Sequence, residues 1–383
     1  MAKYKLGDIC EIVSGCTPKT GIDEYWNGDI KWITPAELSD ESYVISDSVR
    51  KITDLAVKKT GMTSLPVGTV LLSSRAPIGK VAIAGCEMYC NQGFKNLICS
   101  DIINNRYLYW FLKGNTAFLN SLGRGATFKE ISKSIVSEIE INVPDIQEQE
   151  EAVANLEKIN KVIALRKREL VLLEDLISAR FVEMFGDPLD KKIANMIFTE
   201  CLEFNPKKSE VKNLQDIKAS FVPMECIGTD GSFTIRDSGK VREYYKGYTY
   251  FRDGDVLLAK ITPCFENGKV AIAEGCENGI GFGTTEFHVF RPKCGISNSY
   301  WIKYLLKNEG VHKLATMNMS GSAGQKRIQT PFFQKLKIFL PPLELQNQFA
   351  DFVRSTDKLK VEIQKSLDET QILFDSLMQK YFG

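Results

Sequence analysis

The spacing of apolar positions changes along the chain and divides it into four segments. Residues 1–143 and 187–340 contain short β-branched and aromatic runs joined by Gly-containing turns, which predict short strands. Residues 144–186 and 341–383 instead place apolar residues three, four and seven positions apart among charged residues, which predicts long helices. We therefore predict a mixed α+β chain with two globular domains, 1–143 and 187–340, each followed by one long helix.

The second half of the chain repeats the first. VPDIQEQ, residues 143–149, returns as LPPLELQ, residues 340–346, at an offset of 197 residues. Further upstream the register drifts, but GTVLL at 68–72 matches GDVLL at 254–258, and GKVAIA follows each of them. Similar framework segments with divergent sequences between them indicate two copies of one unit rather than a short-period solenoid.

Local signals place further helices and the ends of the long ones. Residues 104–123 and 297–317 have helical spacing, with Asn and Ser available at their starts. Asp145, with Glu148 three residues later, predicts a capped start for the first long helix. Gly186, followed by an Asp-Pro pair, predicts its end.

Apolar residues seven apart on the long helices predict a seam between them. The interface residues predicted from this pattern are Leu156, Ile163, Leu170 and Ile177 in the first helix, and Phe352, Leu359, Ile363, Leu367 and Phe374 in the second. The alternative is that each helix packs only on its own globule. A mutual pair is favoured because a helix that faces a globule seldom keeps apolar sevens over five heptads.

Composition restricts the class of protein. The chain has 383 residues, 44% of them hydrophobic and 25% charged, as in an ordinary globular protein of two or three domains. It has no signal-peptide pattern and no apolar run that could span a bilayer, so we expect it in the cytoplasm. Cys86 and Cys90 have a metal-like spacing, but no second pair or nearby histidine completes a zinc site, so we expect free thiols and no metal. His288 and His312 are the only histidines, and we interpret both as surface or strand residues.

Charge is distributed unevenly although the net charge is only +1. The long helical segments from Glu140 to Gly186 and from Glu344 to Gly383 carry −4 and −2, which leaves +7 for the rest of the chain. Two loops at equivalent places, GRGATFK at 123–129 and SGSAGQKR at 320–327, combine glycines, hydroxyl residues and cations. Such loops suit a DNA backbone. Each loop taken alone could be a solvated turn, but its recurrence in both halves of the chain favours a functional role.

These motifs together make the chain resemble the specificity subunit of type I restriction-modification systems. The resemblance rests on the duplicated PPLELQ-type helix entry, the GxVLL and GKVAI strands and the QKRI element, and it covers essentially the whole chain. The first copy departs from the pattern, with PDIQEQ for PPLELQ and FKEI for QKRI.

The resemblance implies an architecture and a set of partners. Each globule would be a target recognition domain that reads one half of a split double-stranded DNA sequence, and the helices would pair antiparallel as a coiled-coil spacer. Two modification (methyltransferase) subunits carrying S-adenosylmethionine would dock on the spacer, and restriction subunits would join them.

Sequence motifs of catalysis are missing, and we predict a non-catalytic subunit without a cofactor of its own. An adenine methyltransferase would show Asn-Pro-Pro and an aromatic residue, but Asn205-Pro206 runs into Lys207. Pro144-Asp145 matches the start of a nuclease signature, but it has no convincing E-x-K partner on a strand. A Gly-rich phosphate loop is also missing. The rival hypothesis is a coiled-coil adaptor that binds no DNA.

Polar residues at turns between apolar strands are the candidate DNA contacts. Arginine and lysine suit guanine edges or phosphates, and Asn91 and Gln92 could pair with adenine, although Asn91-Gln92-Gly93 could also be only a tight turn. The candidates are Thr34, Arg75, Lys80, Asn91, Gln92, Arg124, Lys129, Lys260, Lys269, Thr285, Gln325, Lys326 and Arg327.

Overall fold

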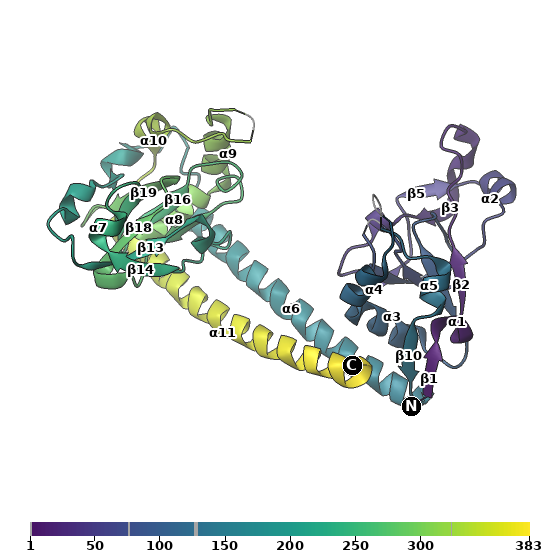
Figure 1. Ribbon diagram of the computed structural model, residues 1–383. Coiled ribbons are helices and arrows are strands. Elements are labelled where there is room, and N and C mark those ends of the chain that lie inside the picture. The colour runs from purple at the N-terminus through teal and green to yellow at the C-terminus, as the bar shows by residue number, and fades with distance from the viewer. Residues whose placement is uncertain (1, 76, 126–128, 323) are drawn as a thin grey trace. The chain divides into compact units, whose positions relative to one another are not determined.

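The chain folds into two units, each made of a mixed α/β head and one half of each long helix (Figure 1). The structure is a computed structural model that describes residues 2–75, 77–125, 129–322 and 324–383. Unit 1 comprises Met1–Lys167 with Lys365–Gly383, and unit 2 comprises Arg168–Gln364. The long helices are α6 (Ile146–Phe185) and α11 (Leu343–Phe382), so the divisions between the units fall inside helices.

The head of unit 1 has three sheets. A pair joins β1 and β10, a five-stranded sheet has the order β2-β9-β6-β7-β4, and a three-stranded sheet has the order β5-β3-β8. Its strands are β1 (Ala2–Lys5), β2 (Cys10–Ser14), β3 (Trp26–Ile33), β4 (Val44–Ile45), β5 (Arg50–Ile52), β6 (Val70–Leu72), β7 (Val81–Ala84), β8 (Tyr89–Cys90), β9 (Lys95–Cys99) and β10 (Glu140–Val143). Its helices are α1 (Leu6–Ile9), α2 (Asp54–Thr60), α3 (Asn105–Gly114), α4 (Thr116–Leu122) and α5 (Lys133–Ser137), with 3-10 turns η1 (Asp23–Tyr25) and η2 (Pro35–Glu37).

The head of unit 2 repeats this plan. The order β12-β19-β16-β17 corresponds to β2-β9-β6-β7, and β14-β13-β18 corresponds to β5-β3-β8, including the parallel pairing of β13 with β18. Its strands are β11 (Met196–Ile197), β12 (Leu202–Phe204), β13 (Lys218–Val222), β14 (Asp237–Lys240), β15 (Thr249–Arg252), β16 (Val256–Ala259), β17 (Val270–Ile272), β18 (Ile280–Gly283), β19 (Phe287–Pro292) and β20 (Lys337–Ile338). Its helices are α7 (Val241–Tyr244), α8 (Ser299–Lys307), α9 (Glu309–Met317) and α10 (Thr330–Lys335), with 3-10 turns η3 (Phe198–Glu200), η4 (Lys208–Val211), η5 (Met224–Cys226) and η6 (Glu277–Gly279).

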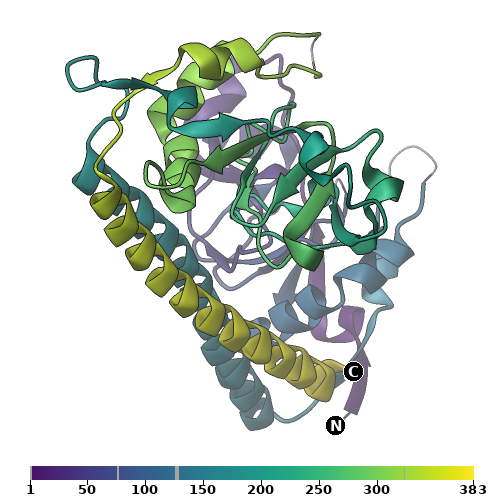
Figure 2. The same cartoon turned by 90° about the vertical axis from the view of Figure 1, so that its left-hand side faces the viewer.

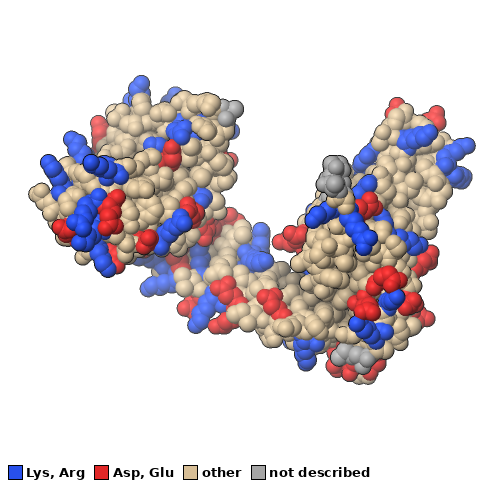
Figure 3. All heavy atoms as spheres, in the orientation of Figure 1, with Lys and Arg blue, Asp and Glu red and all other residues tan. Residues whose placement is uncertain are grey.

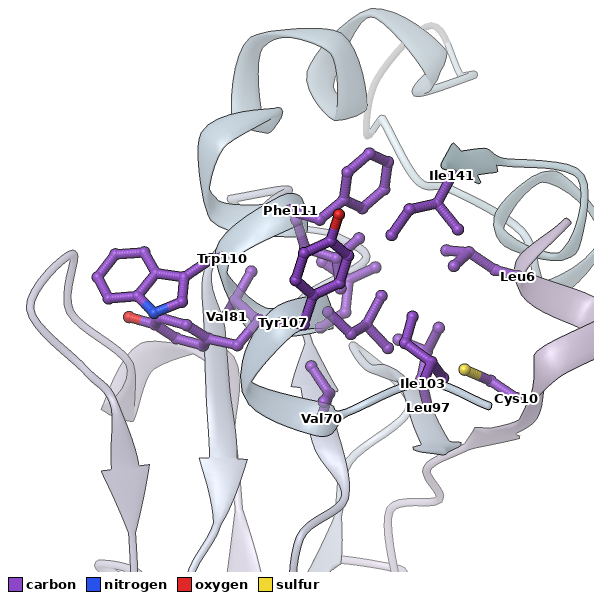
Figure 4. Packing of buried hydrophobic residues seen from close by; sticks show 14 of the residues in the cluster. Leu6, Cys10, Val70, Val81, Leu97, Ile103, Tyr107, Trp110, Phe111 and Ile141 are labelled. Carbon is purple, nitrogen blue, oxygen red and sulfur yellow. The ribbon is translucent and has the colours of Figure 1, made fainter. Parts of the chain in front are cut away.

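Each head buries one helix against one of its sheets, the five-stranded sheet in unit 1 and the β12-β19-β16-β17 sheet in unit 2. In unit 1, Tyr107 and Trp110 of α3 lie in one cluster with Val70, Val81 and Leu97 of the sheet (Figure 4). In unit 2, Trp301 of α8 has the corresponding role. Burying such aromatic side chains contributes roughly 2–3 kcal/mol each, so these helices fix the sheet on which the loops are mounted.

The two predicted head helices are each interrupted. Residues 104–123 form α3 and α4, and residues 297–317 form α8 and α9, so a single helix in either place is wrong. The breaks occur at asparagines. The Asn308 side chain accepts hydrogen bonds from the backbone N–H groups of Gly310 and Val311 and so caps α9, a local alternative to continuing the helix.

The duplicated motif before each long helix ends in a fully buried glutamine. Gln149 accepts a hydrogen bond from the Asn104 N–H (2.8 Å) and donates to the carbonyls of Ile102 (3.0 Å) and Pro144 (2.9 Å). Gln346 makes the same three bonds, from Asn298 N–H (2.9 Å) and to Ile296 (3.1 Å) and Pro341 (2.8 Å). The motif therefore ties each long helix to the loop before the buried head helix.

In unit 1 the first half of α6 lies beside the last half of α11, and both pack on the head (Figures 1 and 2). Asn155 bonds to the Tyr381 hydroxyl (3.1 Å), and Arg166 bonds to the Ser366 carbonyl and the Thr370 hydroxyl. Residue numbers rise on one helix as they fall on the other, so the pair is antiparallel. The predicted start is also observed, because the Glu148 N–H donates to Asp145 Oδ1 (2.9 Å).

In unit 2 the last half of α6 pairs with the first half of α11. Phe181 and Phe185 each place their rings 5.5 Å from Phe349, which also meets Tyr304 of the head. Glu174 accepts hydrogen bonds from Lys360 of α11 (2.5 Å) and from Lys307 of α8, and these cations hold its pKa below the ordinary value despite burial. The helices thus pair with each other and also with the head.

The predicted seam needs one correction. Leu156, Ile163, Ile177 and Leu367 are buried, and Leu170, Ile363 and Phe374 are half-buried. Leu359, however, is 57% exposed, and its place in the interface is wrong. The buried line of α11 runs through Val353 and Thr356, so the sevenfold line drawn through half-buried Phe352 lies one residue away from the seam.

The predicted fold class is confirmed, with two similar α/β heads and two long helices that pack together. Within the described ranges, none of the helices is both long and apolar enough to cross a membrane.

Candidate nucleic-acid interface

A short hairpin loop projects from the same place in each head. In unit 1, Arg124 and Glu130 exchange two backbone hydrogen bonds of 3.0 Å, and Ile131 N–H donates to the Ser74 carbonyl (3.0 Å). In unit 2, Ser320 and Arg327 exchange bonds of 3.0 and 2.8 Å. Residues 126–128 of the GRGATFK loop and residue 323 of SGSAGQKR lie outside the described residues.

The two hairpins occupy equivalent positions. Ile328 N–H donates to the Lys260 carbonyl (2.9 Å), as Ile131 donates to that of Ser74, and Ile131 and Ile328 are 197 residues apart. The duplicated loop noticed in the sequence is therefore one structural device used twice, attached just after β6 in unit 1 and just after β16 in unit 2.

An ion pair holds each hairpin against the sheet. In unit 1 the hairpin supplies the carboxylate, and in unit 2 the hairpin supplies the cation. In unit 1, Lys95 of β9, whose side chain is only 8% exposed, bonds to Glu130 (2.9 Å). In unit 2, Arg327 forms a bidentate pair with Glu286, at 2.9 to 3.2 Å. The arginine holds the pKa of Glu286 below its ordinary value and Glu286 raises the pKa of Arg327, chiefly through their hydrogen bonds.

The prediction for Arg327 is corrected accordingly. Its guanidinium is committed to Glu286 and, through Nη1, to the Gln325 carbonyl (3.0 Å), so it supports the loop instead of offering a free cation. Lys95 was missed by the sequence analysis, because a lysine inside an apolar strand gives no sign of a partner 35 residues away.

The remaining hairpin candidates are available to a ligand. Arg124, Lys129, Gln325 and Lys326 are exposed, and none of their side chains makes an ion pair or hydrogen bond within the described ranges. Each hairpin therefore presents at least one uncompensated cation, which is the requirement for attracting a phosphate.

Two predicted lysines have a structural role. Lys80 donates to the Leu38 carbonyl, and Lys269 donates to the Met224 carbonyl (3.2 Å). Leu38 directly follows η2 and Met224 begins η5, the 3-10 turns that come after β3 and β13. The GKVAI repeat therefore preserves a brace from the start of β7 or β17 to the equivalent turn in each head. We remove both lysines from the set of contacts for this reason.

Three candidates of unit 1 lie close together around the start of η2. The Thr34 hydroxyl donates to Glu37 (3.0 Å), which also accepts from the Thr34 N–H (2.8 Å), so this threonine caps a turn and is likewise removed. The side-chain oxygen Oδ1 of Asn91 accepts from the Gly93 N–H (2.9 Å), as in the tight-turn alternative, and Gln92 Oε1 accepts from the Thr17 hydroxyl. The amide nitrogens of Asn91 and Gln92 stay available as donors.

The last candidates lie beside the hairpins. Arg75 forms a backbone bridge opposite Glu130 and is half-buried, Lys260 is half-buried next to the Glu286 carboxylate, and Thr285 is exposed. The structure therefore gathers these residues with their hairpin in each head.

A basic region that the sequence analysis missed surrounds α7. Basic side chains gather over this part of unit 2 in Figure 3. Lys240 and Arg242 there pair with Asp216, whereas Lys207, Lys212 and Lys246 are exposed and make no ion pair in the portion of the chain described. The signal was the recurrence of lysines through residues 207–246.

Both histidines pack against aromatic rings, and the cysteines are buried or half-buried except for exposed Cys294. His288 is buried in β19, its Nε2 lies 3.0 Å from the Ile328 carbonyl, and burial lowers its pKa to about 4. His312 stacks on Phe265 with ring centroids 4.7 Å apart, so the surface-or-strand interpretation is wrong for this residue, which lies in α9. All ten cysteines are free, and the described residues contain no cluster of three or more potential metal ligands.

Comparison with known proteins points to one family. The sequence model described as the type I restriction modification DNA specificity domain matches residues 1–175 and 200–371. The MjaIX specificity subunit of Methanocaldococcus jannaschii is 40% identical over 217 residues, which are 56% of this chain and 50% of that protein. The EcoAI specificity subunit of Escherichia coli is 42% identical over 188 residues, 47% of this chain and 31% of that protein. The chain therefore spans half or less of the length of these two relatives.

Other proteins match over the full chain at lower identity. The MjaVIII specificity subunit of M. jannaschii is 24% identical over 387 residues, 95% of this chain and 88% of that protein. The crystal structure of the type I restriction-modification S subunit from M. genitalium aligns with a TM-score of 0.57 at 14% identity, covering 100% of this chain and 96% of that one. A chain from a structure of type I R-M complex assembly aligns with a TM-score of 0.60 at 17% identity, covering 99% and 97%. These two structures show the same fold.

Proposed function

This chain belongs to the type I restriction-modification DNA specificity family, and from that premise we propose that it is the non-catalytic subunit that recognises DNA for a type I complex. The observation that carries the proposal is the hairpin loop, which recurs in both heads with the same backbone bonds and unpaired cations. The described cations Arg124, Lys129 and Lys326 lie next to the backbone bonds that tie the ends of the loops to the sheets, so they are placed to contact a phosphate backbone.

The duplicated heads support a two-part DNA target. Each head carries its own hairpin and its own divergent loops, and direct readout of bases depends on such loops. We propose that each head reads one half-site and that the antiparallel helices determine the spacing between them, as symmetric dimers do with half-sites about 34 Å apart for each DNA turn. This proposal extends the family assignment to the geometry of the target.

The helix pair also supports docking of partner subunits. Several aliphatic residues on its surface are exposed although the neighbouring seam is buried, and such apolar patches on a charged helix are typical of protein interfaces. The exposed residues are Leu165, Val171, Leu172, Leu176, Val182, Leu359, Val361, Ile372 and Leu373. We propose that two modification subunits, which would carry S-adenosylmethionine, bind here, and that restriction subunits join them.

The decisive experiment expresses the chain with its modification subunit and maps methylated adenines by sequencing. We expect one bipartite motif, with two specified half-sites and an unspecified gap. Deleting one heptad at residues 163–169, with a matching deletion in α11, should change the gap and leave both half-sites intact. Methylation at a single undivided motif would contradict the two-headed reading, and complete absence of methylation with a stable complex would favour a non-DNA adaptor.

A further inference from the structure

An apolar groove of about 830 Å³ lies in unit 2, and its lining includes Asn318 and Gln329, which flank the 320–327 hairpin in the sequence. Helix α9 supplies Leu314, α10 supplies Pro331 and Phe332, and the segment after α6 supplies Leu189 and Ala194. Beside it, Met317 is 70% exposed and Ile193 is 41% exposed. Exposed apolar side chains gathered around a hollow are typical of a protein-binding surface.

Among the residues described, the charged residues that line this groove are all lysines. Lys191, Lys335 and Lys337 line it and are exposed, and none of the three ammonium groups makes an ion pair or a hydrogen bond within the described ranges. No described carboxylate lines the groove. An apolar floor with unpaired lysines at its rim is complementary to a segment that carries both apolar and acidic side chains.

The groove has a counterpart in unit 1, of about 640 Å³. Both grooves use two residues four positions apart near the end of the second head helix. These are Phe118 and Leu122 of α4 in unit 1, and Leu314 of α9 with Asn318, the residue after α9, in unit 2. Five further lining positions correspond at the offset of 197, namely Ser134, Ile135, Glu138, Ile139 and Glu140 with Pro331, Phe332, Lys335, Leu336 and Lys337.

The repeat reverses the charges of the rim. Where unit 2 has Lys335 and Lys337, unit 1 has Glu138 and Glu140, and these carboxylates pair with Lys5 (2.5 Å) and Lys3 (2.6 Å) of β1. Strand pairing aligns Tyr4 with Met196, because they lie opposite the equivalent residues Ile141 and Ile338. The two β1 lysines therefore correspond to neutral Asn195 and Ile197. Among the described lining residues, unit 2 is left with three unpaired lysines, whereas in unit 1 Arg124 is the only charged residue without an ion-pair partner.

We propose that the groove of unit 2 binds an amphipathic helical segment of a partner protein, with its apolar face on Leu314 and Phe332 and its carboxylates on the three lysines. A helix in an apolar groove is a common mode of peptide recognition. The apolar floor of Leu314, Pro331 and Phe332 favours a protein segment with aliphatic side chains over a DNA duplex, which presents charged phosphates along its outer surface. The charge reversal restricts this partner to unit 2, so one chain with two similar heads can bind it in one orientation.

The test uses the full chain and two designed probes. Each probe is a fluorescent helical peptide of about 18 residues, with leucines along one face and either glutamates or lysines beside them. We expect the glutamate peptide to bind at least about tenfold more tightly than its lysine twin, and increasing salt to reduce the difference. The variant Lys191→Glu/Lys335→Glu/Lys337→Glu should invert this preference. The control Lys19→Glu/Lys58→Glu/Lys59→Glu, with the same change in net charge at exposed positions of unit 1, should preserve it.

Three outcomes would overturn the proposal. The first is equal binding of both peptides to the unaltered chain, and the second is no binding of either peptide. The third is displacement of the glutamate peptide by duplex DNA together with loss of DNA binding in the groove variant. That third outcome would assign the lysines to nucleic acid. DNA binding by the unaltered chain tests the proposed function separately. If the chain does not bind DNA, the proposed function fails, but the comparison of the two peptides still tests the groove. Thermal melting checks that the variants fold, and Leu314→Ser should weaken both peptides without inverting their order.

Discussion

Replacing the buried glutamine of either helix entry should destabilise its own unit. In Gln346→Met an unbranched side chain of similar length removes one acceptor and the two-hydrogen donor, and it leaves the Asn298 N–H and the carbonyls of Ile296 and Pro341 without their side-chain partner. Gln346 is 0% exposed, so water reaches these groups only if the structure opens. Gln149→Met should do the same in unit 1.

The magnitude follows from the three bonds lost. A buried polar group left unpaired costs about 1–3 kcal/mol, and the more apolar methionine recovers part of the total, so we expect a loss of about 3–4 kcal/mol. For a unit of this size about 1 kcal/mol corresponds to roughly 2–4 °C, so the melting temperature should fall by about 10 °C. The loss should be local, because each glutamine ties one helix to one head.

Urea denaturation and calorimetry measure the loss, and hydrogen exchange followed by mass spectrometry locates it. Gln348→Met, two residues further along the same helix and exposed, is the matched control, as is exposed Gln147→Met in unit 1. Faster exchange should appear near Asn298 in Gln346→Met and near Asn104 in Gln149→Met. If Gln346→Met stays within about 1 kcal/mol of Gln348→Met, the motif does not fasten the helix and the reasoning fails.

Two further results are expected. Burial lowers the pKa of His288 to about 4 from an ordinary 6.5, so between these pH values the unfolded chain binds a proton at this residue and the folded chain does not. The free energy of unfolding should therefore fall as pH drops from 6.5 towards 4, by about 2 kcal/mol at pH 5. If His288→Gln keeps the same pH dependence in a urea series, this explanation is refuted. Lys326→Ala should lower the affinity for DNA and reduce the slope of log affinity against log salt concentration by about 0.9. Arg327→Ala should leave that slope nearly unchanged, because the charge of Arg327 is already paired with Glu286. Equal slopes for the two variants would contradict the assignment.

Local patterns were sufficient for the elements and the repeat. The heptads of the first long helix, the cap at Asp145 and the end at Gly186 depend on residues within one or two turns, and the structure has them as predicted. The offset of 197 correctly indicated equivalent hairpins and helix entries, because copies of one unit fold alike. The same reasoning wrongly included Leu359 in the seam of α11, since the apolar line through Phe352 and Leu359 is only one position from the buried line through Val353.

What the sequence by itself determined is therefore the order of elements, the duplication and the places where function should be sought. The tertiary structure decided which charged side chains remain free there: Arg327, Lys80 and Lys269 are engaged with Glu286, Leu38 and Met224, while Lys129 and Lys326 are not. The physical reason is range. Periodicity and capping act between residues three to seven apart, whereas a cation finds its carboxylate or carbonyl among residues that only the folded chain brings within hydrogen-bonding distance.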